Sequence, residues 1–322
     1  MWSNKIKERF CKECNLPITI FDEPYFTNRL DLLEPFYRSR TKWEIFTRSY
    51  ELSRFTSEQE YYEHYNAVKD EVINTIKSTD AYNRFNTKDF SVYEIKPKYK
   101  LPTTDIYKPI NDGRRLISID MREANFAALY HFDGSMFNYT PHWKPYFGKF
   151  TENYHLMNSK YLRQVILGNC NPKRHITYEK WLTFKLLTYL DEFFDTEMYL
   201  EYFSNDEIVL DGSSLDWNNI YKITNEFMEI NMVEYRITEF ILHSIKGTKG
   251  YYKEITNCSD YFNIIDYEFK CLEPYTIPSI IRMATGQPSN EEDLYFIAEN
   301  GRLAKFIEPL DIKIPVLKEF KE

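Results

Sequence analysis

The stretch SIDMREANFAALYHFDG at residues 118–134, together with YFSNDEIVLD at residues 202–211, decides the fold that we predict for this chain. In each stretch a short apolar, strand-like run delivers acidic side chains to its end: Asp120 in the first, and Asp206 with Glu207 in the second. Carboxylates that are far apart in the sequence can meet when their strands are adjacent in a sheet. Paired carboxylates of this kind are what a two-metal site for phosphoryl transfer needs.

The composition of the 322-residue chain indicates a folded protein with a sizeable core. Hydrophobic residues make up 43% of the chain and aromatic residues 17%, with 27 Tyr and 24 Phe against 9 Gly. The net charge of −8 argues against a protein that coats nucleic acid without specificity, because such a protein is basic overall. It is compatible with a nucleic-acid enzyme that has a local basic groove beside an acidic metal site.

The cysteines and the hydropathy pattern bear on location. The five cysteines are odd in number and scattered, which favours a reducing compartment, and Cys11-x-x-Cys14 has no second pair to complete a zinc site. We find no signal-peptide pattern at the start of the sequence and no run of about 18 apolar residues. We therefore expect a soluble intracellular protein without a membrane partner, in the cytoplasm or in the nucleus of a host.

The first part of the chain divides into two regions. Residues 1–95 are predicted to be mostly helical, with helical periodicity over 42–80. Residues 96–115 form a proline-containing connector, the densest basic stretch of the chain, and include Lys98 and Lys100. The connector reads either as a solvated linker or as a strand that grips a phosphate backbone.

The second part of the chain predicts an α+β domain followed by a small appendage. Over residues 116–256 the order is a strand at 116–120, a helix, an aromatic and irregular segment at 131–160, helices that include 177–194, a hairpin, a helix at 217–232 and further strands. This order predicts an antiparallel sheet packed on helices. Residues 257–322 read as a mixed appendage, with one helix that begins after Ser289 and ends at Gly301.

The order of elements from residue 116 onward resembles the palm of the A-family DNA polymerases. The first stretch is similar to the family motif of an apolar strand, an aspartate and a helix, with Asp120 in the metal-binding place and His131 near the helix end. The second is similar to the motif His-Asp-Glu followed by an apolar strand. Asp206 and Glu207 match that motif, and Asn205 stands where the family has its histidine.

The segment LRQVILGNCNPKRHITYEKWLTFKLLTYL at 162–190 is similar to the part of these polymerases that contacts the duplex near the primer end. The resemblance gives Arg163, Asn171 and Lys173 this role. It covers residues 116–255 and leaves out both ends of the chain.

Two departures from the family concern the incoming nucleotide. The fingers are reduced to 131–160, and the candidates for triphosphate contacts are Lys144, Lys149 and Lys160. Asn125 takes the place of a glutamate that helps the family to exclude the ribose 2′-hydroxyl.

The resemblance implies a nucleotidyltransferase that adds nucleotides to a nucleic-acid 3′ end. Its catalytic residues would be Asp120, Asp206 and Glu207. Its metal ligands would be Asp120, Asp206 and the backbone carbonyl of Met121, and hard oxygen ligands suit Mg²⁺ or Mn²⁺. Its partners would be nucleoside triphosphates and a primer or primer–template.

Two other functions fit the same residues. The first is an inactive protein on a palm scaffold, which would bind nucleic acid or offer an exposed aromatic surface at 131–160 to a protein partner. The second is a metal-dependent nuclease, because paired carboxylates also support phosphodiester hydrolysis.

Overall fold

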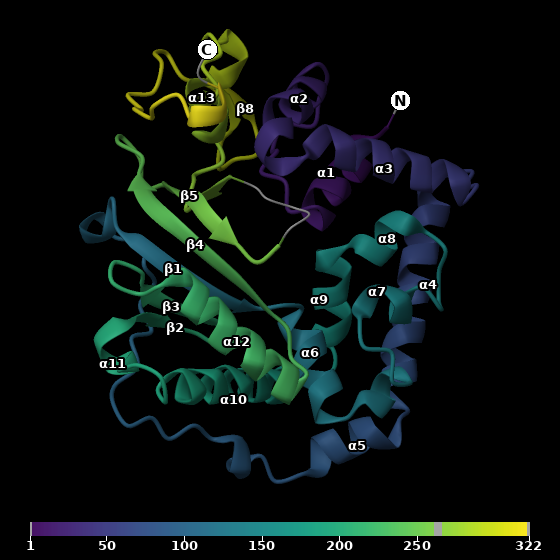
Figure 1. The fold of residues 1–322 in the computed structure, drawn as a ribbon. Helices are drawn as coiled ribbons and strands as arrows, with labels where there is room; N and C mark the ends of the chain where they lie inside the picture. The colour runs from purple at the N-terminus through teal and green to yellow at the C-terminus, as the bar shows by residue number, and fades with distance from the viewer. Residues whose placement is uncertain (1, 261–265, 321–322) are drawn as a thin grey trace.

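The computed structural model describes residues 2–260 and 266–320, which form one large β-sheet and a set of surrounding helices (Figure 1). The helices in chain order are α1 (Asn4–Glu13), α2 (Tyr25–Tyr37), α3 (Ser39–Leu52), α4 (Glu58–Lys77), α5 (Asp80–Thr87), α6 (Ala124–Phe132), α7 (Trp143–Phe147), α8 (Tyr154–Asn158), α9 (Lys160–Gly168), α10 (Pro172–Leu190), α11 (Thr196–Tyr199), α12 (Trp217–Asn231) and α13 (Ile277–Ala284).

The main sheet is antiparallel throughout and has the strand order β2-β3-β1-β4-β5-β6. Its strands are β1 (Arg115–Met121), β2 (Leu200–Phe203), β3 (Glu207–Asp211), β4 (Tyr235–Ser244), β5 (Tyr251–Cys258) and β6 (Tyr267–Lys270). From β1 to β4 the chain follows a β-α-β-β-α-β order, with β1 between β3 and β4. The predicted α+β class and the antiparallel sheet packed on helices are confirmed.

Strand β1 is central because its residues alternate between two different environments. Ile117 and Ile119 belong to the apolar core between the sheet and its helices. Ser118 and Asp120 lie on the opposite face, where they line a cavity. A strand sends successive side chains to opposite faces, so this short sequence both anchors the sheet and presents polar groups.

Helices α10 and α12 cover one face of the sheet, along the lower side of the strands in Figure 1. Leu182 and Leu186 of α10 and Phe227 of α12 are buried against this face. The predicted helix at 217–232 is confirmed within one residue. The long helix predicted at 177–194 is α10, and it begins earlier, at Pro172, where proline suits the first helical turn.

The N-terminal region is helical, and the periodic stretch at 42–80 consists mainly of two helices, α3 and α4. Ser57 caps α4 by accepting a hydrogen bond from the amide of Glu60. The carboxylate of Glu60 accepts hydrogen bonds from Thr56 and not from Ser57. Ser57 therefore marks the start of a second helix within the periodic range.

The segment at 131–160 folds into short helices whose rings mostly point inward. The buried rings are those of Phe137, Trp143, Tyr146 and Phe147, all at 2% exposure or less. They join the same core as the N-terminal helices. Tyr139 and Tyr154 are exposed. The predicted aromatic surface for a protein partner is therefore wrong for most of this segment, because its rings hold the helices together.

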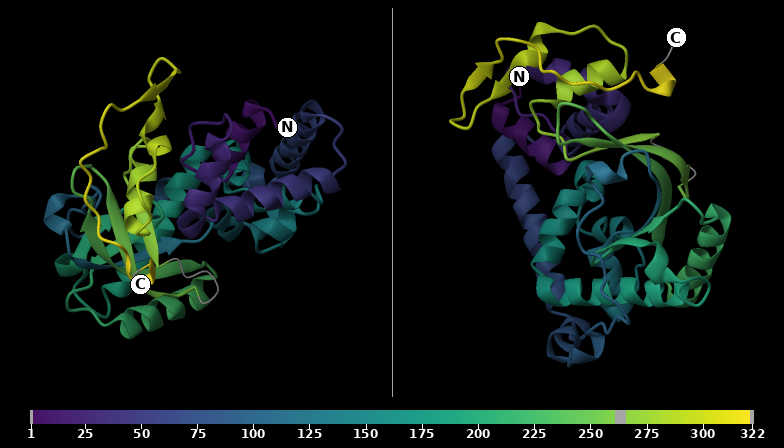
Figure 2. Two further views of the ribbon diagram at one scale, coloured as in Figure 1. Left: turned by 90° about the horizontal axis from the view of Figure 1, so that it is seen from above. Right: turned by 90° about the vertical axis from the view of Figure 1, so that its left-hand side faces the viewer.

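The C-terminal region differs from its prediction in two ways. Strand β6 pairs with β5, so the sheet extends beyond the boundary that we placed at residue 257. The predicted helix from 289 to 301 is absent from the structure. In its place are a 3-10 turn at Glu291–Leu294, capped by Asn290, and a ribbon of β7 (Tyr295–Ile297) and β8 (Leu303–Lys305). Helix α13 packs on α2, which places the C-terminal region beside the N-terminal helices (Figure 2).

Across residues 2–260 and 266–320, no helix is both long enough and apolar enough to span a bilayer.

Candidate functional site

The structure brings the two acidic stretches together at one end of the sheet. Strands β1 and β3 are adjacent and antiparallel, and Asp120 lies directly opposite Glu207. The amide nitrogen of Met121 lies 2.7 Å from the carbonyl oxygen of Asp206, which fixes the turn between β2 and β3 to the end of β1. The predicted meeting of these strand ends is therefore observed.

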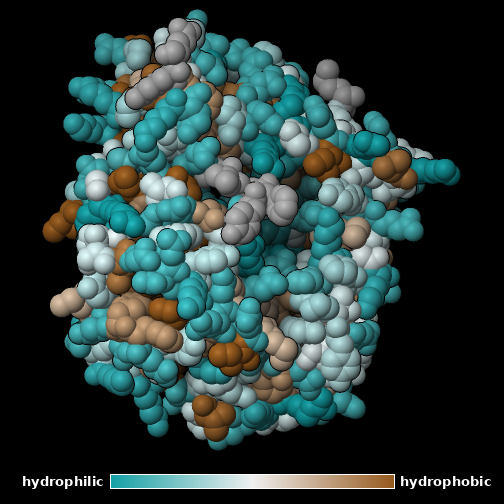
Figure 3. Space-filling model, viewed as in Figure 1, coloured by the Kyte–Doolittle hydropathy of each residue, from teal (hydrophilic) through white to brown (hydrophobic). Residues whose placement is uncertain are grey.

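Asp120 and Glu207 face the side of the sheet that α10 and α12 leave uncovered. They line a cavity of about 540 Å³, and Ser118 also lines it. The Ser118 hydroxyl donates a hydrogen bond to the carboxylate of Glu207, with an oxygen–oxygen distance of 2.5 Å. This contact orients Glu207 beside Asp120. Figure 3 shows a hollow with hydrophilic residues near the centre of this view of the molecule.

Asp206 lies beside this pair but does not line the cavity. The Ser204 hydroxyl donates to its carboxylate across 3.1 Å, within the turn. The negative charge of Asp206 raises the pKa of Asp120 and also acts on Glu179 of α10. Thr183 of α10 donates to the carbonyl of Asn205, so the turn is anchored to the helix layer. In this arrangement Glu207, more than Asp206, shares the cavity with Asp120.

The electrostatics of Asp120 are unusual for an aspartate. Asp120 is exposed at the surface of its strand, yet it lines the cavity and has protein around it there. This burial, with the charges of Glu207 and Asp206, raises the pKa of Asp120 to about 7. Among the described residues, no cationic side chain forms an ion pair with Asp120, Asp206 or Glu207 within 4.0 Å. Two adjacent carboxylates without a close counter-charge are a place where a cation is stabilised.

Cationic side chains line the same cavity at a greater distance from the carboxylates. Lys160, at the start of α9, and Lys253, on β5, both act to lower the pKa of Asp120. Lys253 is buried, with its Nζ 4.2 Å from the ring centre of Phe240, and burial lowers its pKa. Arg236 is held by Glu268 across 3.2 Å and by Asp260 across 3.3 Å. The cavity thus combines acidic and basic groups, as a site for a metal-bound phosphate does.

Sequence reasoning found Lys160 but not Lys253, Arg236 or Tyr107, which also line the cavity. Lys253 and Arg236 stand in strands that read as ordinary alternating sequence. Their role depends on which strands are neighbours, and the sequence carries no local signal of this.

The other residues predicted to bind nucleic acid lie outside this cavity. Arg163 pairs with Glu123 across 2.5 Å, and Glu123 also accepts the amide of Trp143, so this arginine joins α9 to the segment before α6. Asn125 accepts the amide of its neighbour Phe126.

Asn171 and Lys173 lie where α10 begins. Asn171 occupies the left-handed region with φ 57° and donates to the side chain of Asn86 across 2.6 Å. Lys173 is exposed in the first turn of the helix. The structure does not bring either residue to Asp120.

The basic connector wraps around the β2 side of the sheet. Lys98 pairs with Asp191, at the far end of α10, and Lys100 is exposed nearby. The carbonyl of Pro102 accepts a hydrogen bond from the amide of Phe203, the last residue of β2. The connector then crosses to the open face, where Tyr107 reaches the cavity. The connector therefore contributes a tyrosine to the cavity, and its first lysines lie on the helix side.

The residues present suit a magnesium ion that substrate helps to bind. Across the described part of the chain, no three His, Cys, Asp or Glu side chains are grouped closely enough to hold a metal ion. Mg²⁺ is often bound by one or two carboxylates, water and substrate phosphates rather than by a cage of protein ligands. Asp120 and Glu207, with lysines nearby for phosphate, match that donor set.

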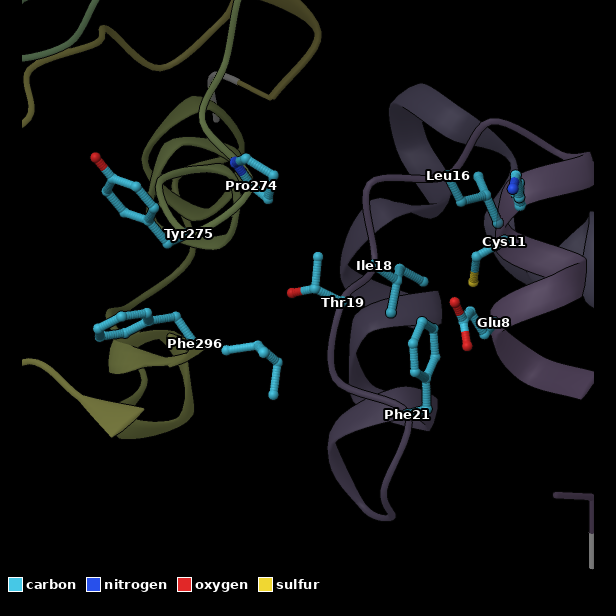
Figure 4. A pocket seen from close by; sticks show the side chains of 11 residues that line it. Glu8, Cys11, Leu16, Ile18, Thr19, Phe21, Pro274, Tyr275 and Phe296 are labelled. Carbon is cyan, nitrogen blue, oxygen red and sulfur yellow. The ribbon is translucent and has the colours of Figure 1, made fainter. Parts of the chain in front are cut away.

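A second cavity, of about 470 Å³, lies between the N-terminal segment and the C-terminal region. Figure 4 shows Ile18 and Phe21 on one side of it and Tyr275 and Phe296 on the other. The acidic residue in its lining is Glu8. This cavity offers apolar contacts but no paired carboxylates, so it does not compete as a site for the chemistry considered above.

No protein-family model matches the chain, and no curated protein or solved structure is significantly similar to it.

Proposed function

We propose that this protein is a nucleotidyltransferase that adds nucleotides to the 3′ end of a nucleic acid, with a domain related to the palm of the A-family DNA polymerases. The observation that carries the proposal is the juxtaposition of Asp120 and Glu207 on β1 and β3, facing one cavity with Lys160 and Lys253. The β-α-β-β-α-β order of the sheet supports it, because a palm has this order of elements.

In this proposal the acidic and basic groups have separate roles. Asp120 and Glu207, with Asp206 beside them, would hold Mg²⁺ or Mn²⁺, which would supply activation of the 3′-hydroxyl and charge neutralisation at the leaving pyrophosphate. Lys160 and Lys253 contact the triphosphate as point charges. Ser118 keeps Glu207 oriented toward Asp120.

Primer extension tests the proposal. A labelled primer, alone and annealed to a template, is incubated with each nucleotide pool and with Mg²⁺ or Mn²⁺. We expect the wild-type protein to lengthen the primer, and Asp120→Asn or Glu207→Gln to reduce extension to background, because each variant removes a negative charge that the cations need. The control is Asp70→Asn, which removes an exposed carboxylate on α4.

Absence of extension by the wild type, or full extension by Asp120→Asn, would contradict the proposal. Shortening of the primer that depends on Asp120 would instead assign a nuclease.

A further inference from the structure

A groove of about 860 Å³, distinct from the two cavities described above, opens beside the Asp120 cavity. It lies between α1 and α3 on one side and α8 and α9 on the other, which pack against one another (Figure 1). Asn15 and Lys160 line both the groove and the cavity. The two hollows therefore meet at these residues, and a chain-like ligand in the groove would lead toward Asp120.

The groove is basic although the protein is acidic. Lys12, Lys42 and Lys160 line it, whereas the whole chain has a net charge of −8. Glu13 is the carboxylate in its lining, and its side chain is fully buried. His155 lies 2.6 Å from that carboxylate, and Arg9 also pairs with it. Since Glu13 is neutralised inside the protein, the lysines determine the charge that a ligand meets.

Two tyrosines line the groove together with these cations. Tyr154 and Tyr161 line the groove, and Tyr154 is 49% exposed. The Nζ of Lys144 lies 4.4 Å from the ring centre of Tyr154, and the Nζ of Lys12 lies 5.4 Å from that of Tyr161. The exposed ring of Tyr154, with the half-buried ring of Tyr161 and the lysines, forms the kind of arrangement that binds single strands, in which bases stack on rings and cations follow the phosphates.

We propose that this groove binds a single-stranded nucleic acid and guides it toward the Asp120 cavity. That the strand leads to a reaction site at Asp120 rests on the proposed function. Binding of the strand in the groove needs neither metal nor nucleotide. A single strand is favoured over a duplex because its unstacked bases can reach the ring of Tyr154, whereas the bases of a duplex are stacked on one another.

Fluorescence anisotropy with a labelled oligothymidylate of about 20 nucleotides tests the inference, with EDTA present. The groove variant is Lys12→Gln combined with Lys42→Gln. We expect it to bind about tenfold more weakly than the wild type, and the slope of log affinity against log salt to be smaller in magnitude by about 1.4, because two phosphate contacts are lost. The control is Lys222→Gln combined with Lys246→Gln, two exposed lysines outside the groove, which removes the same charge.

A second pair of variants separates stacking from charge. Tyr154→Ala is expected to weaken binding about tenfold, and Tyr154→Phe to leave it unchanged, since the ring and not the hydroxyl stacks on a base. Equal weakening by the groove and control lysine variants, tighter binding of a duplex of the same length, or no binding by the wild type would overturn the inference.

Asp120→Asn distinguishes this inference from the proposed function. We expect this variant to bind the oligonucleotide in EDTA as the wild type does, because Asp120 does not line the groove. Binding without any primer extension by the wild type would retain the groove and reject the transferase. Loss of oligonucleotide binding in Asp120→Asn would contradict the inference that the groove binds the strand without a contribution from Asp120.

Discussion

Asp120 and Glu207 are neighbours because of strand alternation and not because of any attraction between them. Asp120 shares the polar face of β1 with Ser118, and antiparallel pairing sets Glu207 opposite it. Carboxylates on directly opposite residues of neighbouring strands repel each other. Burial, together with this repulsion, raises the pKa of Asp120 to about 7. Without a close counter-charge, this pair of carboxylates destabilises the folded protein. A bound cation would offset that destabilisation.

His131 provides a pH prediction at the scale of one residue. Its Nδ1 lies 2.9 Å from the Tyr178 hydroxyl, between α6 and α10, and burial, with a smaller effect of Lys185, lowers its pKa from 6.5 to about 4. His131 therefore becomes protonated near pH 6.5 in the unfolded chain but only near pH 4 in the folded chain. This residue thus makes the free energy of unfolding fall as the pH falls through that window.

The measurement is urea unfolding of the wild type and of His131→Gln, at neutral pH and at about pH 5. We expect the variant to lose less stability on acidification than the wild type does. His142→Gln, at an exposed histidine, serves as the control. An equal loss in the wild type and in His131→Gln would contradict the assignment.

At the scale of elements, a buried carboxylate joins three helices of the N-terminal half. Glu13 of α1 accepts a hydrogen bond from the Tyr61 hydroxyl of α4 across 3.0 Å and lies 2.6 Å from His155 of α8. Burial alone would raise the pKa of Glu13, but the hydrogen bond and charge of His155, with the charge of Arg9, lower it. The carboxylate is therefore ionised and fully paired in the folded protein.

Glu13→Ala is expected to lower the free energy of unfolding by about 3–5 kcal/mol, because it leaves buried partners without their counter-charge. Urea unfolding measures this change. Glu8→Ala, on the exposed side of the same helix, is expected to change the value by less than about 0.5 kcal/mol. A loss for Glu13→Ala no larger than that of the control would show that the network does not stabilise the helices.

The sequence predicted the elements whose pattern is local. The strand at 116–120 and the helix at 217–232 were found because apolar spacing alone determines such elements. The helix predicted from 289 to 301 was wrong because Ser289 was taken for a helix cap, whereas Asn290 caps only a single 3-10 turn. Part of the cavity was predicted: Asp120 and Glu207 came from motifs and Lys160 was a candidate for triphosphate contacts, whereas Lys253 depends on the pairing of β5 with β4.

At the scale of the whole molecule, the N-terminal helices and the C-terminal region meet through one buried ion-pair network. Asp293, which is 4% exposed, pairs with Arg29 of α2 across 2.7 Å and also with Arg282 of α13. The same α2 contributes Phe36 and Tyr37 to the lining of the Asp120 cavity. The contact of the C-terminal region with α2 therefore helps to position two residues that line the Asp120 cavity.

Asp293→Ala is expected to loosen this docking, because it leaves two arginines without their shared partner in a buried place. Hydrogen exchange followed by mass spectrometry should show faster exchange in α13 and α2, with β1 and β3 unaffected. Glu299→Ala, an exposed acid in the same region, is the control. Unchanged exchange in α13 of the Asp293 variant would show that apolar packing alone holds the region.

The central claim, that Asp120 and Glu207 together hold a divalent cation, is tested most directly by titrating Mn²⁺ and following its free form by electron paramagnetic resonance. A non-hydrolysable nucleoside triphosphate is present, because substrate phosphates are expected to complete the coordination. The account predicts that the wild type and Asp70→Asn bind Mn²⁺ equally. It predicts that Asp120→Asn and Glu207→Gln each bind it about tenfold more weakly or worse. Equal affinity in all four proteins, or no binding by the wild type, would contradict it.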